Sequence, residues 1–200
     1  MIYLFSTEIG HDANSIGFPS VETCFAIVLQ TDVMLIGWHS FNTLLPQTTA
    51  NAGVFANYIT SVPAHGTAVH LYGATNRKGH GGDWKAELRA IAGQIGYTGP
   101  ATLVDLKQSE GTYVQFDRDA HARTCLVTYK RNAKMLYTKT DSDINAIPHR
   151  RIHAGAVAPL YGGDDGLAPV YTAAHVHPLT SSSRRLHTAG WGNTTNFTIT

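Results

Sequence analysis

Two residue types that can carry out nucleophilic catalysis lie at the ends of one apolar stretch of this chain. The stretch "TCFAIVLQTDVMLIGWHS" contains Cys24 near its start and His39 near its end. A cysteine attacks a carbonyl carbon as its thiolate, which a neighbouring imidazolium stabilises. The same imidazole can protonate the leaving group and then activate water. A Cys-His pair here would therefore form the centre of a covalent hydrolase.

Contact between the two side chains depends on the register of a hairpin. The runs "CFAIVL" and "VMLIGWHS" are apolar and rich in β-branched residues, and a polar "QTD" separates them, as in a buried hairpin. A two-residue turn at Thr31-Asp32, or a four-residue loop, sets Cys24 directly opposite His39, with Cβ atoms roughly 4.5–5.5 Å apart. A three-residue loop sets Trp38 opposite Cys24 instead.

A purely structural role for both residues is the alternative. Cysteine is among the most buried residue types and often packs as a small hydrophobe. His39 could be a polar residue at a strand end whose ring is satisfied by the backbone. Spacing alone favours this structural interpretation, since catalytic pairs are rarer.

Composition describes a globular chain with no strong charge. Of its 200 residues 43% are apolar and 14% charged, with 15 basic against 14 acidic side chains. This balance gives no reason to expect nucleic acid or an anionic membrane as partner. The start lacks the pattern of a secretory signal. With only Cys24 and Cys125 as cysteines, we expect a cytoplasmic protein, or an effector exported without a cleavable signal; one disulfide between them stays open.

Periodicity and turn residues predict an α+β fold, which we expect to be a layered β-sandwich or mixed sheets flanked by two helices. We expect a short first strand, a turn-rich loop up to residue 23, the hairpin, and a helix over 48–62. A strand at 67–74, a glycine-rich loop, an N-cap at Asp83, a helix over 84–97 and strands at 101–106, 112–117 and 124–130 follow. Residues 1–138 form the predicted domain, and 139–200 a C-terminal extension packed on it or appended to it.

The order of motifs from about residue 13 to 130 resembles the CheD family of chemoreceptor glutamine deamidases. The matching segments are "CFAIVL", "IGWHSFNTLLP", "VHLYGATN", "LVDL" and "EGTYVQFDRDAHARTCLV". The Cys-to-His spacing is also similar to that of the catalytic domains of the cytotoxic necrotizing factors, toxins that deamidate a glutamine in Rho GTPases. The resemblance implies their layered fold and a Cys-His mechanism without a cofactor.

The same resemblance assigns roles to four residues. Cys24 would be the nucleophile and His39 the general base and acid. The family's Thr-Leu-Gly-Leu segment corresponds to "SIGF", so Ser15 is the candidate hydroxyl that orients His39, and Thr23 is the second candidate. The implied reaction converts a glutamine side chain of a protein substrate into glutamate, through a thioester, with release of ammonia.

Two histidine clusters raise the question of a metal. "HRRIH" contains His149 and His153, and "HVH" contains His175 and His177; these spacings can give two ligands from a helix or a strand. A zinc site needs three or four converging ligands, and no cysteine pair or "HExxH" accompanies them. We therefore expect exposed histidines and no metal.

Three functional hypotheses remain. The first is a deamidase acting on chemoreceptors, and the second is a toxin or effector deamidase acting on a host protein. The third is a non-catalytic protein-binding module on the same fold, an idea that the segment 139–200, absent from the compact family pattern, keeps open.

Overall fold

The computed structural model describes residues 2–4, 8–21, 23–40, 45–76, 82–106, 112–119, 124–130, 149–151, 184–187 and 194–200. Within these ranges only the backbone is described at 20, 45–50, 112–113, 124–130, 149–151 and 184–187. The predicted α+β class is confirmed: two helices accompany two β-sheets, each of which contains parallel and antiparallel pairs.

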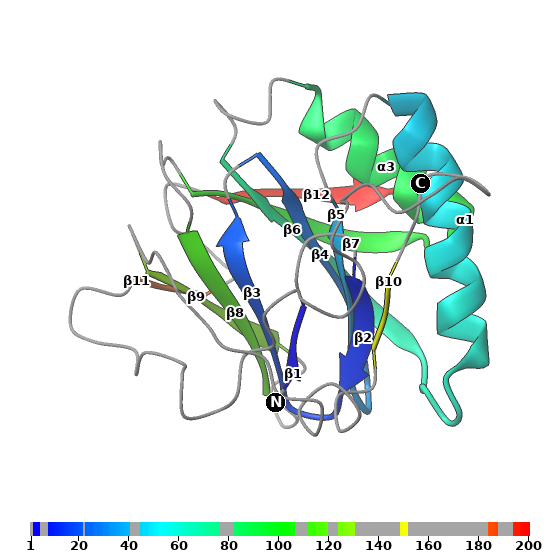
Figure 1. Cartoon of the computed structure of the whole chain (residues 1–200), viewed down its shortest axis with the longest axis horizontal. Coiled ribbons are helices and arrows are strands. Elements are labelled where there is room, and N and C mark those ends of the chain that lie inside the picture. The colour runs from blue at the N-terminus through cyan, green and yellow to red at the C-terminus, as the bar shows by residue number, and fades with distance from the viewer. Residues whose placement is uncertain are drawn as a thin grey trace.

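The elements form three layers, with the larger sheet between the smaller sheet and the helices (Figure 1). In the described ranges the larger sheet has seven strands, in the order β10 (His149–Arg151), β2 (Glu8–Asp12), β5 (Leu35–Ser40), β4 (Phe25–Thr31), β6 (Ala68–Thr75), β7 (Gly99–Asp105) and β12 (Thr194–Ile199). The smaller sheet has five, β1 (Ile2–Tyr3), β3 (Ser15–Val21), β8 (Thr112–Asp119), β9 (Thr124–Lys130) and β11 (Arg184–His187). The helices are α1 (Leu45–Ser61) and α3 (Trp84–Gln94).

The central strand β4 contributes to two separate hydrophobic cores. Phe25, Ile27 and Leu29 belong to the core beneath the helices, while Ala26 and Val28 belong to the core between the two sheets. Successive side chains of a strand point to opposite faces, so a strand covered on both sides needs apolar residues at every position. This explains why "FAIVL" is a continuous apolar run.

The predicted loop from residue 10 to 23 is wrong, because it contains most of strands β2 and β3. The Asp12 carboxylate accepts hydrogen bonds from the backbone N–H groups of Asn14 (2.8 Å) and Ser15 (2.9 Å). This tight turn carries the chain from the larger sheet to the smaller one. Ile16 and Phe18 are then fully buried between the sheets. Pairing with β8 thus outweighs the weak strand propensity of "SIGFPSV".

Both predicted helices are confirmed. The Asp83 carboxylate caps α3 by accepting from the backbone N–H groups of Lys85 (3.1 Å) and Ala86 (3.0 Å), the role expected of an N-cap. Leu88 and Ile91 then lie fully buried on the face of α3 that covers the larger sheet. None of the described helices is long and apolar enough to cross a bilayer.

The described strands after residue 138 pair with strands of both sheets. β12 pairs with β7 and β10 with β2 in the larger sheet, whereas β11 pairs with β9 in the smaller one. Phe197 of β12 packs against the core beneath the helices, and Lys85 and Arg89 of α3 lie over its ring at 4.9 and 5.3 Å. The segment 139–200 therefore supplies edge strands to both sheets.

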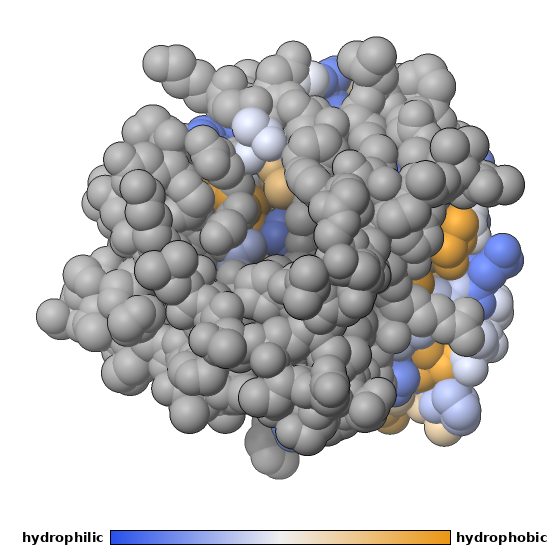
Figure 2. Space-filling model, in the orientation of Figure 1, coloured by the Kyte–Doolittle hydropathy of each residue, from blue (hydrophilic) through white to orange (hydrophobic). Residues whose placement is uncertain are grey.

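The described surface mixes apolar and polar residues. Its large exposed hydrophobic residues are Val33 and Val54. At the right edge of Figure 2, where Figure 1 shows α1, hydrophobic and hydrophilic residues are interspersed. Isolated exposed apolar side chains of this kind are normal on a globular protein.

Close packing between the two sheets depends on a glycine. A Cβ atom at Gly37 of β5 would lie 2.9 Å from Leu4 Cδ1, 3.0 Å from the Phe18 ring and 3.1 Å from Ile16 Cδ1. These three side chains belong to the core between the sheets. Gly37 thus allows the segment containing Leu4 to approach β5 closely.

We predict that Gly37→Ala destabilises the fold by about 1–3 kcal/mol, the usual range for overpacking a core. Gly53→Ala is the matched control, since nothing lies within 4 Å of a Cβ at Gly53 of α1, and alanine stabilises a helix interior by up to about 1 kcal/mol. Urea unfolding of both variants measures the difference. Equal stability of the two variants would contradict the proposed packing role.

Candidate active site

The hairpin joins β4 to β5 in a register different from the predicted one. Ala26, not Cys24, lies opposite His39, and the chain turns at Asp32-Val33, one residue later than expected. The expectation that Cys24 and His39 are direct partners in the ladder is therefore wrong. The Thr31 hydroxyl explains the shift, because it accepts from the backbone N–H groups of Val33 (3.3 Å) and Met34 (3.0 Å) and stabilises the later turn.

The observed register still places the two side chains on one face of the sheet. A shift of two positions preserves the face on which each side chain lies, since the side-chain period of a strand is two. Cys24 lies in the bend that immediately precedes β4. Continued one residue into this bend, the alternation of β4 predicts the face of Ala26 for the Cys24 side chain, diagonal to His39 in the β4–β5 register.

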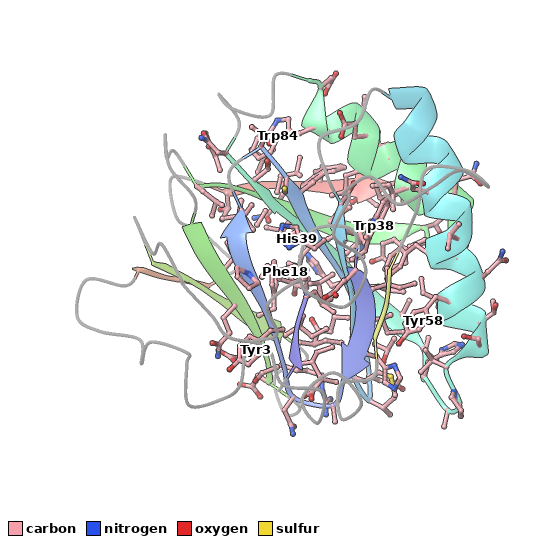
Figure 3. The ribbon with its side chains drawn as sticks, in the orientation of Figure 1. Tyr3, Phe18, Trp38, His39, Tyr58 and Trp84 are labelled. Carbon is pink, nitrogen blue, oxygen red and sulfur yellow. The ribbon has the colours of Figure 1, made fainter. Side chains whose placement is uncertain are left out.

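His39 is held by the backbone of a segment far away in sequence. Its Nδ1 lies 2.7 Å from the carbonyl oxygen of Leu4, and the Leu4 N–H donates in turn to the Gly17 carbonyl at 2.9 Å. The Phe18 ring contacts the imidazole edge-on, with centroids 5.7 Å apart. Figure 3 shows His39 and Phe18 between β3 and the larger sheet, whereas Trp38, the next residue, lies on the side of α1.

This hydrogen bond determines which nitrogen of the neutral ring carries the proton. A carbonyl oxygen can only accept, so Nδ1–H of His39 donates to Leu4 and Nε2 keeps its lone pair. Nε2 is buried and has no hydrogen-bond partner among the described residues. A histidine anchored through Nδ1 with a bare Nε2 is what a general base requires.

Burial keeps the ring neutral. His39 is only 1% exposed, and loss of solvation lowers its pKa from 6.5 to about 4, although the hydrogen bond to Leu4 acts in the opposite direction. At pH 7 the ring is therefore an uncharged base. This changes the expected chemistry, because no imidazolium stands ready to stabilise a thiolate before substrate binds.

Cys24 is anchored through its backbone. The Thr75 hydroxyl, fully buried at the end of β6, donates to the Cys24 carbonyl oxygen at 2.7 Å. Cys24 itself is 7% exposed and carries a thiol rather than a disulfide. Sequence analysis did not identify Thr75 or Leu4, since both act on partners that lie 51 and 35 positions away.

Ser15 does not orient His39. Its hydroxyl donates to Asp117 Oδ1 at 2.7 Å. Its neighbour Ile16 points into the core between the sheets, so Ser15 faces the other side of the smaller sheet. The orienting group that the resemblance assigned to Ser15 is instead the Leu4 carbonyl. Thr23, the second candidate, lies half-buried in the bend before Cys24.

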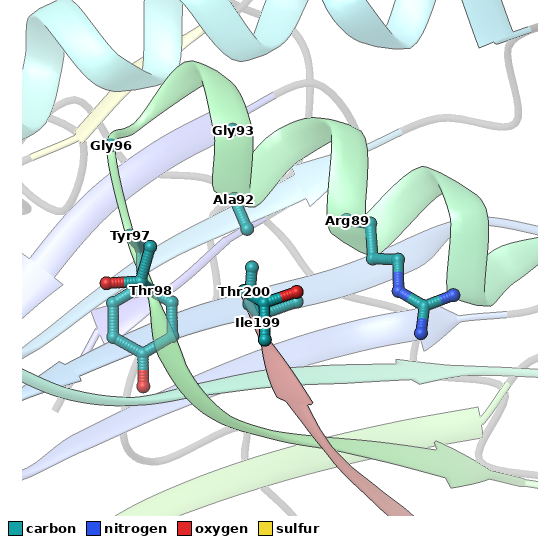
Figure 4. Close-up of a pocket in the computed structure, with 8 residues that line it drawn as sticks. All are labelled: Arg89, Ala92, Gly93, Gly96, Tyr97, Thr98, Ile199 and Thr200. Carbon is teal, nitrogen blue, oxygen red and sulfur yellow. The ribbon is translucent and has the colours of Figure 1, made fainter.

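A pocket of about 380 Å³ lies on the opposite face of the larger sheet (Figure 4). It is formed where α3 ends and β12 ends, with Arg89 as its charged side chain. Ala92, Tyr97 and Ile199 of its lining belong to the core beneath the helices. The sheet therefore separates this pocket from His39.

The described residues contain no cluster of three metal-binding side chains. His153, His175 and His177 lie outside the described residues, and His149 is described only as part of the backbone of β10. The expectation that these histidines bind no metal therefore stays a prediction.

Comparison with known proteins gives no relative: no protein-family model matches the chain, and no curated protein matches it.

The buried neutral imidazole predicts a specific dependence of stability on pH. The unfolded chain takes up a proton at His39 near pH 6.5, whereas the folded protein does so only near pH 4. The contribution of His39 is therefore fully present above pH 6.5 and is lost as the pH falls to 4. The total loss is about 3 kcal/mol, from 1.36 kcal/mol per pKa unit.

Urea unfolding of wild type and His39→Asn at pH 7 and pH 4 measures this loss. An asparagine can keep a donor toward Leu4 but cannot be protonated, so we expect a smaller loss in the variant. Glu8 of β2 lies level with His39, one residue beyond the Ile9–Trp38 pair, and Glu8→Gln in both backgrounds controls for this neighbouring carboxyl group. Equal losses in wild type and His39→Asn would show that His39 titrates normally.

Proposed function

We propose that this protein is a cysteine hydrolase that deamidates a glutamine side chain of a protein substrate. The observation that carries the proposal is His39, whose Nδ1–H is held by the Leu4 carbonyl and whose Nε2 is buried without a partner among the described residues. The alternation of β4, continued by one residue, predicts the same sheet face for Cys24. The motif order that resembles the CheD family adds support, as does the Cys-to-His spacing, which is similar to that of the necrotizing factors. A layered α+β fold agrees with that resemblance.

The first half of the reaction forms a thioester. Nε2 of His39 takes the proton of the Cys24 thiol as sulfur attacks the carboxamide carbon of the substrate. The imidazolium then gives this proton to the departing nitrogen, and ammonia leaves. Because the ring is neutral at rest, proton transfer accompanies attack instead of preceding it.

The second half restores the thiol. Nε2 of His39 takes a proton from a water molecule as the hydroxide attacks the thioester carbon. The carbon–sulfur bond breaks, the Cys24 thiolate recovers its proton from the imidazolium, and the substrate leaves as a carboxylic acid. This acid gives its proton to the released ammonia in solution. The sum of both halves converts one carboxamide and one water into a carboxylate and an ammonium ion.

We predict that Cys24→Ala abolishes conversion and that His39→Asn lowers kcat by about 10²–10⁴-fold, the usual contribution of a general base. The protein is incubated separately with bacterial chemoreceptor signalling fragments and with a eukaryotic cell lysate, and glutamine-to-glutamate conversion is mapped by mass spectrometry. Conversion in one arm distinguishes the chemoreceptor enzyme from the effector. Ser15→Ala serves as control, because its hydroxyl bonds Asp117 on the outer face.

Conversion by the Cys24→Ala variant would rule out this mechanism. Tight binding of a partner without conversion by the wild type would indicate the non-catalytic binding module instead.

The dependence of kcat/KM on pH gives a second prediction. The free enzyme is active with His39 deprotonated, and its pKa of about 4 places the acidic limb of the profile near pH 4. Activity should therefore persist between pH 6.5 and 5, where an ordinary histidine becomes protonated. Circular dichroism at each pH verifies that the protein stays folded. An acidic limb near pH 6.5 would contradict the assignment of this buried ring as base.

A further inference from the structure

A second buried polar side chain, that of Asn76, belongs to the segment beside Cys24. Asn76 directly follows β6, which pairs with β4 on the side away from β5 and His39. Strands β4 and β6 pair so that Ala26 lies opposite Ala74. Continued by two residues beyond this pair, the same register sets Cys24 level with Asn76. The hydrogen bond from Thr75 to the Cys24 carbonyl, 2.7 Å long, shows that the two segments remain adjacent at this level.

Asn76 is buried without a partner for its oxygen. The residue is 3% exposed, and its Oδ1 has no hydrogen-bond partner among the described residues. Continued one residue beyond β6, the alternation predicts for Asn76 the face of Tyr72 and Ala74, which line the core between the sheets. An unsatisfied buried polar group costs about 1–3 kcal/mol, so Asn76 is unfavourable for folding alone.

The register and the alternation thus predict three groups on one sheet face. The strand order is β5, β4, β6, so His39 is expected on one side of Cys24 and Asn76 on the other. Both neighbours present a buried acceptor without a partner, Nε2 and Oδ1. Among the other buried polar atoms of the described residues, the donor Trp38 Nε1 and the acceptor Asn51 Oδ1 belong to the helix-facing side of β5 and to α1.

We propose that Asn76 is the residue that selects a primary carboxamide, through a hydrogen bond from the substrate –NH₂ group to Oδ1. This assignment rests on the deamidase function proposed above. A carboxamide nitrogen offers two N–H donors, whereas an ester or the carboxylate product offers only acceptors toward Oδ1. The nitrogen gains a proton and positive charge as ammonia leaves, so the bond strengthens along the reaction. Repulsion between Oδ1 and the carboxylate favours product release.

Two pools of synthetic peptides test this assignment. Each peptide of the first pool contains one glutamine, and the second pool carries the γ-methyl ester of glutamate at the same position. Wild type and Asn76→Leu, which keeps the volume and removes the acceptor, are compared by mass spectrometry. We expect the ratio of carboxamide to ester kcat/KM to fall about 10- to 100-fold in the variant, as for loss of one strong hydrogen bond.

Thr75→Val is the matched control, since it removes the hydroxyl that anchors the Cys24 backbone. This variant should reduce turnover of both pools by the same factor and leave the ratio unchanged. Asn76→Ala is measured in parallel and provides the ratio if the leucine variant fails to fold.

Each outcome decides the assignment. A selective fall in the ratio supports it. An equal loss on both pools, as in Thr75→Val, would show that Asn76 only positions Cys24, and the deamidase function would stand. Wild type that converts neither pool, or only the esters, would refute the deamidase function and the role of Asn76 together.

Discussion

The hydrogen bond between His39 Nδ1 and the Leu4 carbonyl is the interaction on which the site depends. It joins the larger sheet to the segment that follows β1, across the core between the sheets. The bond requires close approach of the two layers, which Gly37 permits, and a fixed Leu4 backbone, which the Gly17 carbonyl provides. Packing of the two sheets therefore determines the proton position on one imidazole ring.

This arrangement differs from a preformed thiolate–imidazolium pair. Burial removes the solvation that a charged ring needs, and the low pKa of His39 keeps the ring neutral near pH 7. A neutral base and a thiol can coexist in the apolar layer, and in the proposed mechanism charge develops when the substrate is attacked. Polar groups held at that point, such as Asn76, stabilise the developing charge more strongly than the same groups would in water.

Much of the fold follows from local sequence patterns. The apolar runs of β4 and β5, the stripe of α3 and the cap at Asp83 depend on neighbours in sequence, and the structure agrees with the prediction at each of them. β3 could not be predicted in this way, because "SIGFPSV" forms a strand only through pairing with β8.

The site was predictable only in part. The shared face of Cys24 and His39 tolerated an error of two in register, because alternation along a strand has a period of two. The turn itself depended on the Thr31 hydroxyl, which residue types alone did not reveal. A backbone carbonyl such as that of Leu4 has no residue-type signature at all. The family resemblance pointed instead to the hydroxyl of Ser15, which donates a hydrogen bond to Asp117.

Nitrogen-15 NMR of histidine-labelled protein tests the central claim most directly, with His39→Asn used to assign the signal. At pH 7 the account predicts a neutral His39 ring with the proton on Nδ1 and a bare Nε2, and protonation of Nε2 only near pH 4. A ring protonated on Nε2 at pH 7, or one that titrates near 6.5, would contradict it.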